Sequence, residues 1–303
     1  MRAQTVTVGP LATASANNIC ASQTAAGNNQ LALNGTLASS FAVFTASIAG
    51  NQLVVTAVAS GVIQLGQAIN GLGVPANTIV IGPPAGPGQT TVVGGAGTYI
   101  LSTSGTVGST TLYANAVATL DTPRRIQLTT TSASDASKTM TITGTDWNNA
   151  AISEVLVAAS ATTSFTSLDF KTITSIVSSA TYVGAVTVGT NGVASSAWVA
   201  LDEYSPFSTA VQCTVTTAMG SAQKFTVEQT LQNPNSASNA LLPYQAVWIN
   251  STDTAAVQAS TSIVSSFAYA PALARVTINP TAPTAAVTGA VSAVFVQNSG
   301  PSF

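Results

Sequence analysis

The feature that most limits the fold of this chain is a short-range alternation of apolar and polar residues. From Lys138 to Thr143 the apolar side chains fall at every second position, with threonines between them. The same pattern occurs in 125–129, 211–215 and 225–228. Successive side chains of a β-strand point to opposite faces, so this period of two predicts half-buried strands. The abundant Thr, Val and Ile also favour strands, because β-branched side chains fit a pleated surface.

Evidence for helices is thin. The alanine-rich stretch 150–161 has few residues that break a helix, but its centre, Ile152 to Val157, is equally compatible with a strand. Short strands separated by clusters of Gly, Asn, Pro and Ser are typical of sandwiches and barrels. We therefore predict an all-β protein built from tandem β-sandwich or jelly-roll-like domains with a small inserted β-module.

Glycine and charge divide the first part of the chain. Residues 41–114 are rich in glycine, and no Asp, Glu, Lys or Arg occurs between Arg2 and Asp121. We interpret 41–114 as a Gly-rich β-module inserted into a larger N-terminal β domain, which 1–40 and 115–195 form together.

A turn-rich stretch of small residues, 189–196, predicts a second boundary. Beyond it, 196–303 is expected to form a C-terminal β-sandwich domain, and its aromatic residues suggest a core of its own. These residues are Trp198, Tyr204, Phe207, Phe225, Tyr244, Trp248, Phe267, Tyr269 and Phe295.

The composition argues against several classes of protein. Only 5% of the 303 residues are charged, whereas an average domain has about 25%. A net charge of −2 with no basic cluster offers little to neutralise phosphates, so we expect no nucleic-acid partner. The chain has no run of about 18 apolar residues, so the sequence predicts no membrane-spanning helix. Aromatic residues are too few, at 6%, for the girdles of an outer-membrane barrel. The N-terminal Met1 to Val8 begins like a strand and has no apolar signal core, so we expect no export by the usual signal.

The chain also has few residues suited to catalysis. The chain has no His, so a nucleophile would need a Lys or a carboxylate as its base. The only adjacent carboxylates, Asp202 and Glu203, would point to opposite faces of a strand. We expect no catalytic residues, no cofactor and no enzymatic activity.

Metal and phosphate sites are weakly indicated. The oxygen-rich segment from Gly144 to Asn149 lacks the acidic series and closing Glu of a calcium loop, and Asp146 is better explained as a turn former. The glycines of 71–73 and 94–97 are followed by neither a helix nor a Lys, so they favour turns or bulges. Cys20 and Cys213 are interpreted as buried thiols, although a disulfide between them stays open. No metal site is expected.

One compact charged group remains, formed by Asp121, Arg124 and Arg125. It has two open interpretations. It can be a turn entering a strand, with Asp121 paired locally and Arg125 on the polar face. It can also contact an acidic partner surface, since Arg forms good bidentate pairs with carboxylates.

Several segments resemble structural proteins of tailed-bacteriophage virions. The block from Phe44 to Val74, continued by Gly97 to Ser104, resembles a β-module that recurs in these proteins. The segments 121–146, 170–176 and 225–235 are similar to head-associated structural proteins. The resemblance covers most of the chain, implies a place in the virion and carries no catalytic residues. The proline- and glycine-rich loop 82–88 departs from the pattern.

The resemblance implies a capsid decoration or cement protein that binds the major capsid protein or other virion proteins and stabilises the head. It also implies a homo-oligomer, with a trimer preferred because capsid surfaces offer three-fold sites. The alternative is a receptor- or glycan-binding head or tail fibre. Aromatic side chains exposed in 198–297 would favour that alternative, whereas a buried aromatic cluster would not. The scarcity of charge fits assembly, because neutral surfaces associate without desolvating ions.

Overall fold

The computed structural model describes residues 2–82, 94–202, 208–233, 245–279 and 288–297 of an all-β chain. Its strands form several antiparallel sheets consistent with β-sandwich domains, which confirms the predicted fold class. The described residues also include two short 3-10 helices, η1 (Ala133–Asp135) and η3 (Thr254–Ala256). The ambiguous stretch 150–161 contains strand β10. Within these described ranges, no helix is long and apolar enough to cross a membrane.

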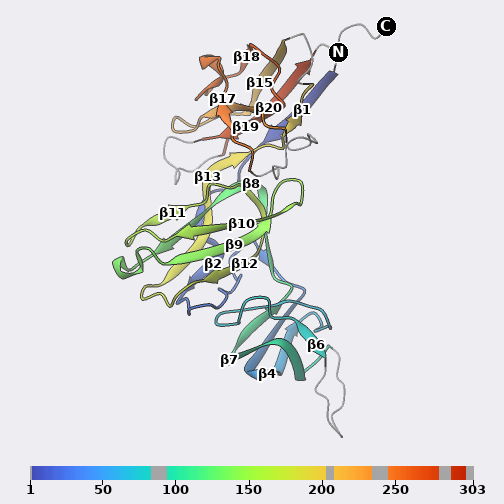
Figure 1. Ribbon diagram of the computed structural model, residues 1–303, viewed down its shortest axis with the longest axis vertical. Helices are drawn as coiled ribbons and strands as arrows, with labels where there is room; N and C mark the ends of the chain where they lie inside the picture. The colour runs from blue at the N-terminus through green and yellow to red at the C-terminus, as the bar shows by residue number, and fades with distance from the viewer. Residues whose placement is uncertain (1, 83–93, 203–207, 234–244, 280–287, 298–303) are drawn as a thin grey trace.

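The sheets follow one another along the molecule, with β1 and β20 near one end and β4 and β7 near the other (Figure 1). The first sheet has the order β1 (Arg2–Val8), β20 (Ala290–Gln297), β15 (Thr209–Thr217) and β18 (Ile263–Ser266). The third sheet has the order β4 (Ala42–Ser60), β7 (Gly97–Ala114) and β5 (Ile69–Asn70), with β6 (Val80–Gly82) also on β7.

A twelve-stranded sheet occupies the middle of the molecule and continues toward the first sheet. Its main path runs β10 (Ala151–Val157), β9 (Thr139–Thr145), β12 (Phe170–Ser178), β8 (Val117–Thr130), β13 (Val186–Ser195), β19 (Leu273–Ile278), β16 (Phe225–Thr230) and β17 (Ile249–Asn250). Four strands pair beside this path: β11 (Thr163–Phe165) and β3 (Ala38–Ser39) on β8, β14 (Val199–Ala200) on β19, and β2 (Ser15–Gln23) on β13.

Buried apolar side chains form three clusters. One combines residues between Ile19 and Leu33 with residues between Ala116 and Val188. A second contains Val8 and residues between Ala194 and Phe295. The third lies between Ala42 and Ala114. These clusters follow the divisions seen in the sequence, while the exact domain boundaries stay a prediction.

The position of strand β1 differs from the prediction, which placed all of 1–40 in the N-terminal domain. It pairs antiparallel with β20, from Arg2 opposite Gln297 to Val8 opposite Val291. Val8 accordingly belongs to the C-terminal cluster, and the chain enters the middle of the molecule only with β2. The local alternation predicts a strand at this position but cannot identify its partner, because the two strands come from opposite ends of the chain.

The turn-rich linker expected at 189–196 is instead largely strand β13. This strand pairs with β8 from Val186 to Thr190 and, after a register shift, again at Ala194, which lies opposite Arg124. Ala194 and Ser195 also pair with β19. Small residues are needed because the backbones approach closely: a Cβ on Gly189 would lie 1.9 Å from the carbonyl oxygen of Ser15. The glycine and serine pattern therefore reflects a strand that passes between two partners.

The module 41–114 is connected to the middle of the molecule by buried amide side chains. Asn70 accepts a hydrogen bond from the backbone N–H of Leu33 and donates one to Gln30, both at 2.8–2.9 Å. Gln30 in turn donates to the carbonyls of Ile69 and Pro75. The module is thus held by specific polar contacts in addition to its two chain connections. Of the loop 82–88, only Gly82 lies within the described residues.

We predict that deleting 41–114 leaves a folded protein. The chain enters and leaves the module side by side, since Ala42 pairs with Ala114, and a short glycine linker can join Ser40 to Asn115. Loss of the hydrogen bonds to Gln30 and Leu33 should lower the unfolding free energy. The loss should be only about 1–3 kcal/mol, because water can then bind the amide of Gln30 and the N–H of Leu33. Circular dichroism and thermal denaturation measure this. An insoluble product from normally expressed protein would contradict the prediction.

The two cysteines are free and buried, as the sequence interpretation expected. Cys20 lies in the middle cluster and Cys213 in the C-terminal cluster. Burial raises the pKa of both thiols, that of Cys213 to about 12, so neither forms a reactive thiolate near neutral pH.

Candidate functional site

The charged group Asp121, Arg124 and Arg125 lies within strand β8 and not in a turn before it. Its pairing with β12 is irregular here: Thr119 faces Thr172, but Arg124 faces Phe170. The additional β8 residues form a bulge that contains Pro123, a residue with no N–H to donate. The expected turn is therefore wrong, because a bulge accommodates the proline inside a continuous strand.

Arg124 is fully buried. Its guanidinium donates hydrogen bonds to the carbonyl oxygens of Ala12 and Asn191 and lies 3.2 Å from the carboxylate of Asp121. Ala12 belongs to the segment between β1 and β2, and Asn191 lies where the register of β13 shifts, between Thr190 and Ala194. One side chain therefore joins the two places where the chain passes between the C-terminal part and the middle. The local pairing expected for Asp121 is confirmed.

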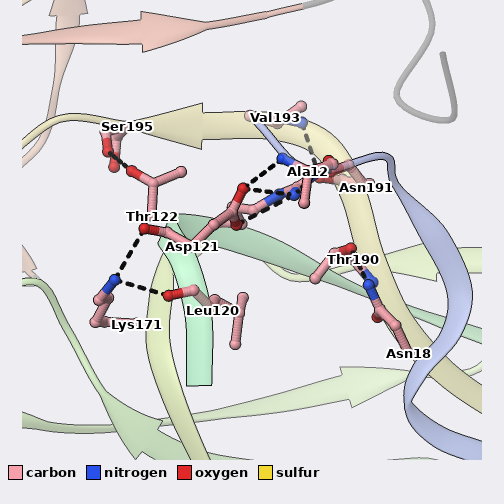
Figure 2. Close-up of polar contacts among 11 residues, drawn as sticks. Ala12, Asn18, Leu120, Asp121, Thr122, Lys171, Thr190, Asn191, Val193 and Ser195 are labelled. Carbon is pink, nitrogen blue, oxygen red and sulfur yellow. Dashed lines mark hydrogen bonds and ion pairs between the residues drawn. The ribbon is translucent and has the colours of Figure 1, made fainter. Parts of the chain in front are cut away.

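The neighbouring groups complete this junction (Figure 2). Asp121 also accepts a hydrogen bond of 2.7 Å from the backbone N–H of Ala12. Lys171 donates to the carbonyls of Leu120 and Asp121, which the bulge leaves without strand partners. The charges here bind the chain to itself, so Arg124 offers no surface contact in this structure.

Arg125 has a different environment, and its side chain is 38% exposed. Its Nε lies 3.9 Å from Oδ1 of Asp169, and Oδ2 of Asp169 lies 3.3 Å from Arg275. Arg275 is also 2.7 Å from Glu228. A partner contact through Arg125 stays a prediction. The structure adds that Arg125 ends a row of alternating charges that leads to a pocket.

This pocket, which we call the tryptophan pocket, has a volume of about 220 Å³. Its lining includes all three tryptophans of the chain, Asp146, Asp169 and Arg275. Trp147 comes from the turn between β9 and β10, Trp198 from the segment between β13 and β14, and Trp248 directly precedes β17. The rings meet edge to face, with centroids 5.4 Å apart for Trp147 and Trp198 and 5.8 Å apart for Trp198 and Trp248.

The polar groups of the pocket are only partly satisfied. Oδ1 of Asp146 accepts hydrogen bonds from the N–H groups of Asn148 and Ala150, as the turn interpretation predicts. Its Oδ2 is buried without a hydrogen-bond partner, and so are Nε1 of Trp147 and Oδ1 of Asp169. Two acceptors and one donor around the pocket therefore lack a hydrogen-bond partner, although Oδ1 of Asp169 lies 3.9 Å from Nε of Arg125. The guanidinium of Arg275 is occupied, since it pairs with two carboxylates and covers the ring of Trp248 at 4.4 Å.

Other acidic residues have structural contacts. Glu154 accepts hydrogen bonds from the backbone N–H groups of Ser167 and Leu168. Asp253 caps η3. Asp135 is fully buried and accepts hydrogen bonds from four donors. No group of acidic, His or Cys side chains suited to a metal ion occurs in the part of the chain that the structure describes. Glu203 lies outside that part, so the pair Asp202–Glu203 is not placed.

The tryptophan pocket was missed because Trp198 and Trp248 were assigned to the C-terminal core. That core contains Phe225, Phe267 and Phe295 but neither tryptophan, and all three tryptophans are only half-buried. Tyr204, Phe207 and Tyr244 lie outside the described residues. The available signal was compositional: the chain has only three tryptophans, and each lies shortly before or after a strand.

Comparison with protein families, curated proteins and solved structures finds no match to this chain. The site is therefore interpreted from its own geometry.

Proposed function

We propose that this chain is a non-enzymatic structural component of a tailed-phage virion, a decoration or cement protein that binds the coat-protein surface and stabilises the head. The observation that carries the proposal is that most of the few charged side chains contact other parts of the same chain. Surface burial, and not chemistry, would then be its mechanism.

Most of the charged side chains contact other parts of the same chain. Five ion pairs involve Arg124, Arg125, Lys138 and Arg275. Lys171, Glu154 and Asp146 bind backbone groups. A partner that covers the remaining neutral surface therefore desolvates few ions, and ion desolvation is the main electrostatic cost of burying a charged interface.

The exposed valine face of strand β10 offers such a surface at one end of the twelve-stranded sheet, because the charged residue of the strand, Glu154, accepts hydrogen bonds from the backbone N–H groups of Ser167 and Leu168. Its side chains Val155 and Val157 are 59% and 52% exposed. Natural proteins commonly protect an edge strand with charge, because open strand edges pair readily with other chains. An edge strand that exposes two valines, and whose single charge is used within the chain, suits a protein that is held against its neighbours in an assembly.

The copy number in purified virions tests the proposal. Quantitative mass spectrometry should find this chain in numbers comparable to the major capsid protein, and light scattering of the free protein should show a homo-oligomer, with a trimer expected. Absence from virions would contradict the proposal. A few copies per particle would instead favour the receptor-binding fibre.

We predict that the double substitution Val155→Lys and Val157→Lys weakens binding to heads that lack this protein by at least tenfold. Two ammonium groups on the edge of β10 would have to be desolvated at the interface. The matched control is Val183→Lys, since Val183 is 70% exposed but lies outside the strands. Co-sedimentation with heads measures both. Equal binding by the double variant and the control would show that β10 is not part of the interface.

A further inference from the structure

The tryptophan pocket combines an apolar aromatic wall with carboxylate oxygens that have no donor within hydrogen-bond distance, Arg125 lying 3.9 Å from that of Asp169. The wall consists of three half-buried indole rings from three separate segments. The oxygens are Oδ2 of Asp146, a residue only 4% exposed, and Oδ1 of Asp169. Small-molecule sites commonly have this composition, in which an apolar lining carries a few polar groups that fix the orientation of the ligand.

The unused polar atoms define the hydrogen bonds that a ligand must supply. An ionised carboxylate only accepts, and an indole N–H only donates. A ligand that donates to Asp146 and Asp169 and accepts from Nε1 of Trp147 would satisfy all three groups. Hydroxyl groups do both, because each carries one donor and two lone pairs.

The charges of the pocket argue against an anion. Arg275 is the basic residue of the lining, and its guanidinium already pairs with Asp169 and Glu228. Arg275 also occupies the place over the Trp248 ring that a bound cation would otherwise take. A neutral ligand is therefore favoured over both an anion and a quaternary ammonium group.

We propose that the tryptophan pocket binds a neutral saccharide. The apolar C–H face of one pyranose ring packs on the indole surface, and its hydroxyl groups donate to Asp146 and Asp169. The volume of about 220 Å³ is below the roughly 300–1,000 Å³ of sites for drug-sized ligands, which suits a ligand of one ring or the end of a longer glycan. The site stands beside the decoration role and does not depend on it: failure of saccharide binding would leave the virion copy number unchanged.

Intrinsic tryptophan fluorescence reports directly on this proposal, because every tryptophan of the chain lines the pocket. The purified full chain is titrated with glucose, galactose, N-acetylglucosamine and the disaccharides lactose, cellobiose and chitobiose. At least one of them should change the emission saturably, with a dissociation constant on the order of 1 mM, as expected for a small ligand. Absence of a saturable change with every probe would overturn the proposal.

Asp146→Asn tests the polar part of the site without removing its turn. The amide oxygen of Asn can accept the bonds from Asn148 and Ala150, because Asn forms the same turns as Asp. The NH₂ group then replaces Oδ2, so an acceptor becomes a donor. Saccharide binding should weaken at least tenfold, while the circular dichroism spectrum stays unchanged. Asp253→Asn, at a cap outside the pocket, is the matched control and should bind normally.

Tetramethylammonium chloride is the competing probe. It should leave the emission unchanged, because Arg275 fills the cation position. A saturable response to tetramethylammonium in place of the saccharides would assign the pocket to a cation and contradict the proposal. Saccharide binding that Asp146→Asn leaves intact would place the ligand elsewhere and contradict it equally.

Discussion

Replacing Arg124 with leucine should lower the free energy of unfolding by about 3–5 kcal/mol, the usual cost of breaking a buried ion pair from one side. The substitution removes the donor to the carbonyls of Ala12 and Asn191, and Asp121 loses its guanidinium partner while it keeps the N–H of Ala12. Since whole domains are stable by only about 5–15 kcal/mol, much of the stability depends on this one side chain. Denaturation in urea, followed by circular dichroism, measures the loss.

The neighbouring arginine provides the control. Arg125→Leu removes an equal charge, but from a partly exposed pair at 3.9 Å, which is worth about 0–1 kcal/mol. Arg124→Lys should fall between the two, because a single ammonium cannot reach three acceptors in the way that a planar guanidinium does. Equal losses for Arg124→Leu and Arg125→Leu would show that the junction does not depend on Arg124.

The second large effect is expected at Asp135, a carboxylate buried beside η1. Its oxygens accept hydrogen bonds from Lys138, Thr130 and the N–H groups of Val183 and Gly184, at 2.6–2.9 Å. Asp135→Asn places an NH₂ group against these donors, so we expect a loss of about 2–4 kcal/mol in unfolding free energy. Urea denaturation at neutral pH measures it. Asp253→Asn is the control, since Asn also caps helices well and should change the stability little.

Asp135 also predicts how stability depends on pH. Burial alone would raise the pKa of this carboxyl, but the hydrogen bonds from Lys138, Thr130, Val183 and Gly184 outweigh burial and hold the pKa well below its usual 3.8. A lowered pKa in the folded state contributes stability above pH 3.8 that is lost as the pH falls below that value. The unfolding free energy of the native chain should therefore drop in acid, and that of Asp135→Asn should drop less. Parallel acid profiles for the two proteins would contradict this assignment.

The alternation of apolar and polar residues was sufficient to predict strands because it is a local property. Lys138 to Thr143 lies largely within β9, and 225–228 begins β16. The uncharged stretch 41–114 likewise contains a cluster of its own. Pairing partners could not be predicted in this way. The pairing of β1 with β20, and the passage of β13 between β8 and β19, depend on contacts between distant parts of the chain.

The candidate site was less accessible from the sequence, for two physical reasons. Arg124 was considered for contact with an acidic partner surface, because arginine forms good bidentate pairs with carboxylates. The bulge at Pro123 interrupts the alternation and turns Arg124 inward. The three tryptophans are far apart in the sequence, and only the folded sheet brings their rings together. Within 198–297, Trp198 and Trp248 are half-buried whereas Phe225, Phe267 and Phe295 form a buried cluster, so the aromatic criterion does not decide for the receptor-binding alternative. The ligand of the tryptophan pocket is a question separate from virion assembly.

A cryo-electron microscopy reconstruction of the virion that carries this chain tests the central claim most directly. On our account, an elongated density of three successive β parts repeats over the head surface and contacts the coat protein. A head surface without this density, with the chain absent from the particle or confined to the tail, would contradict the account.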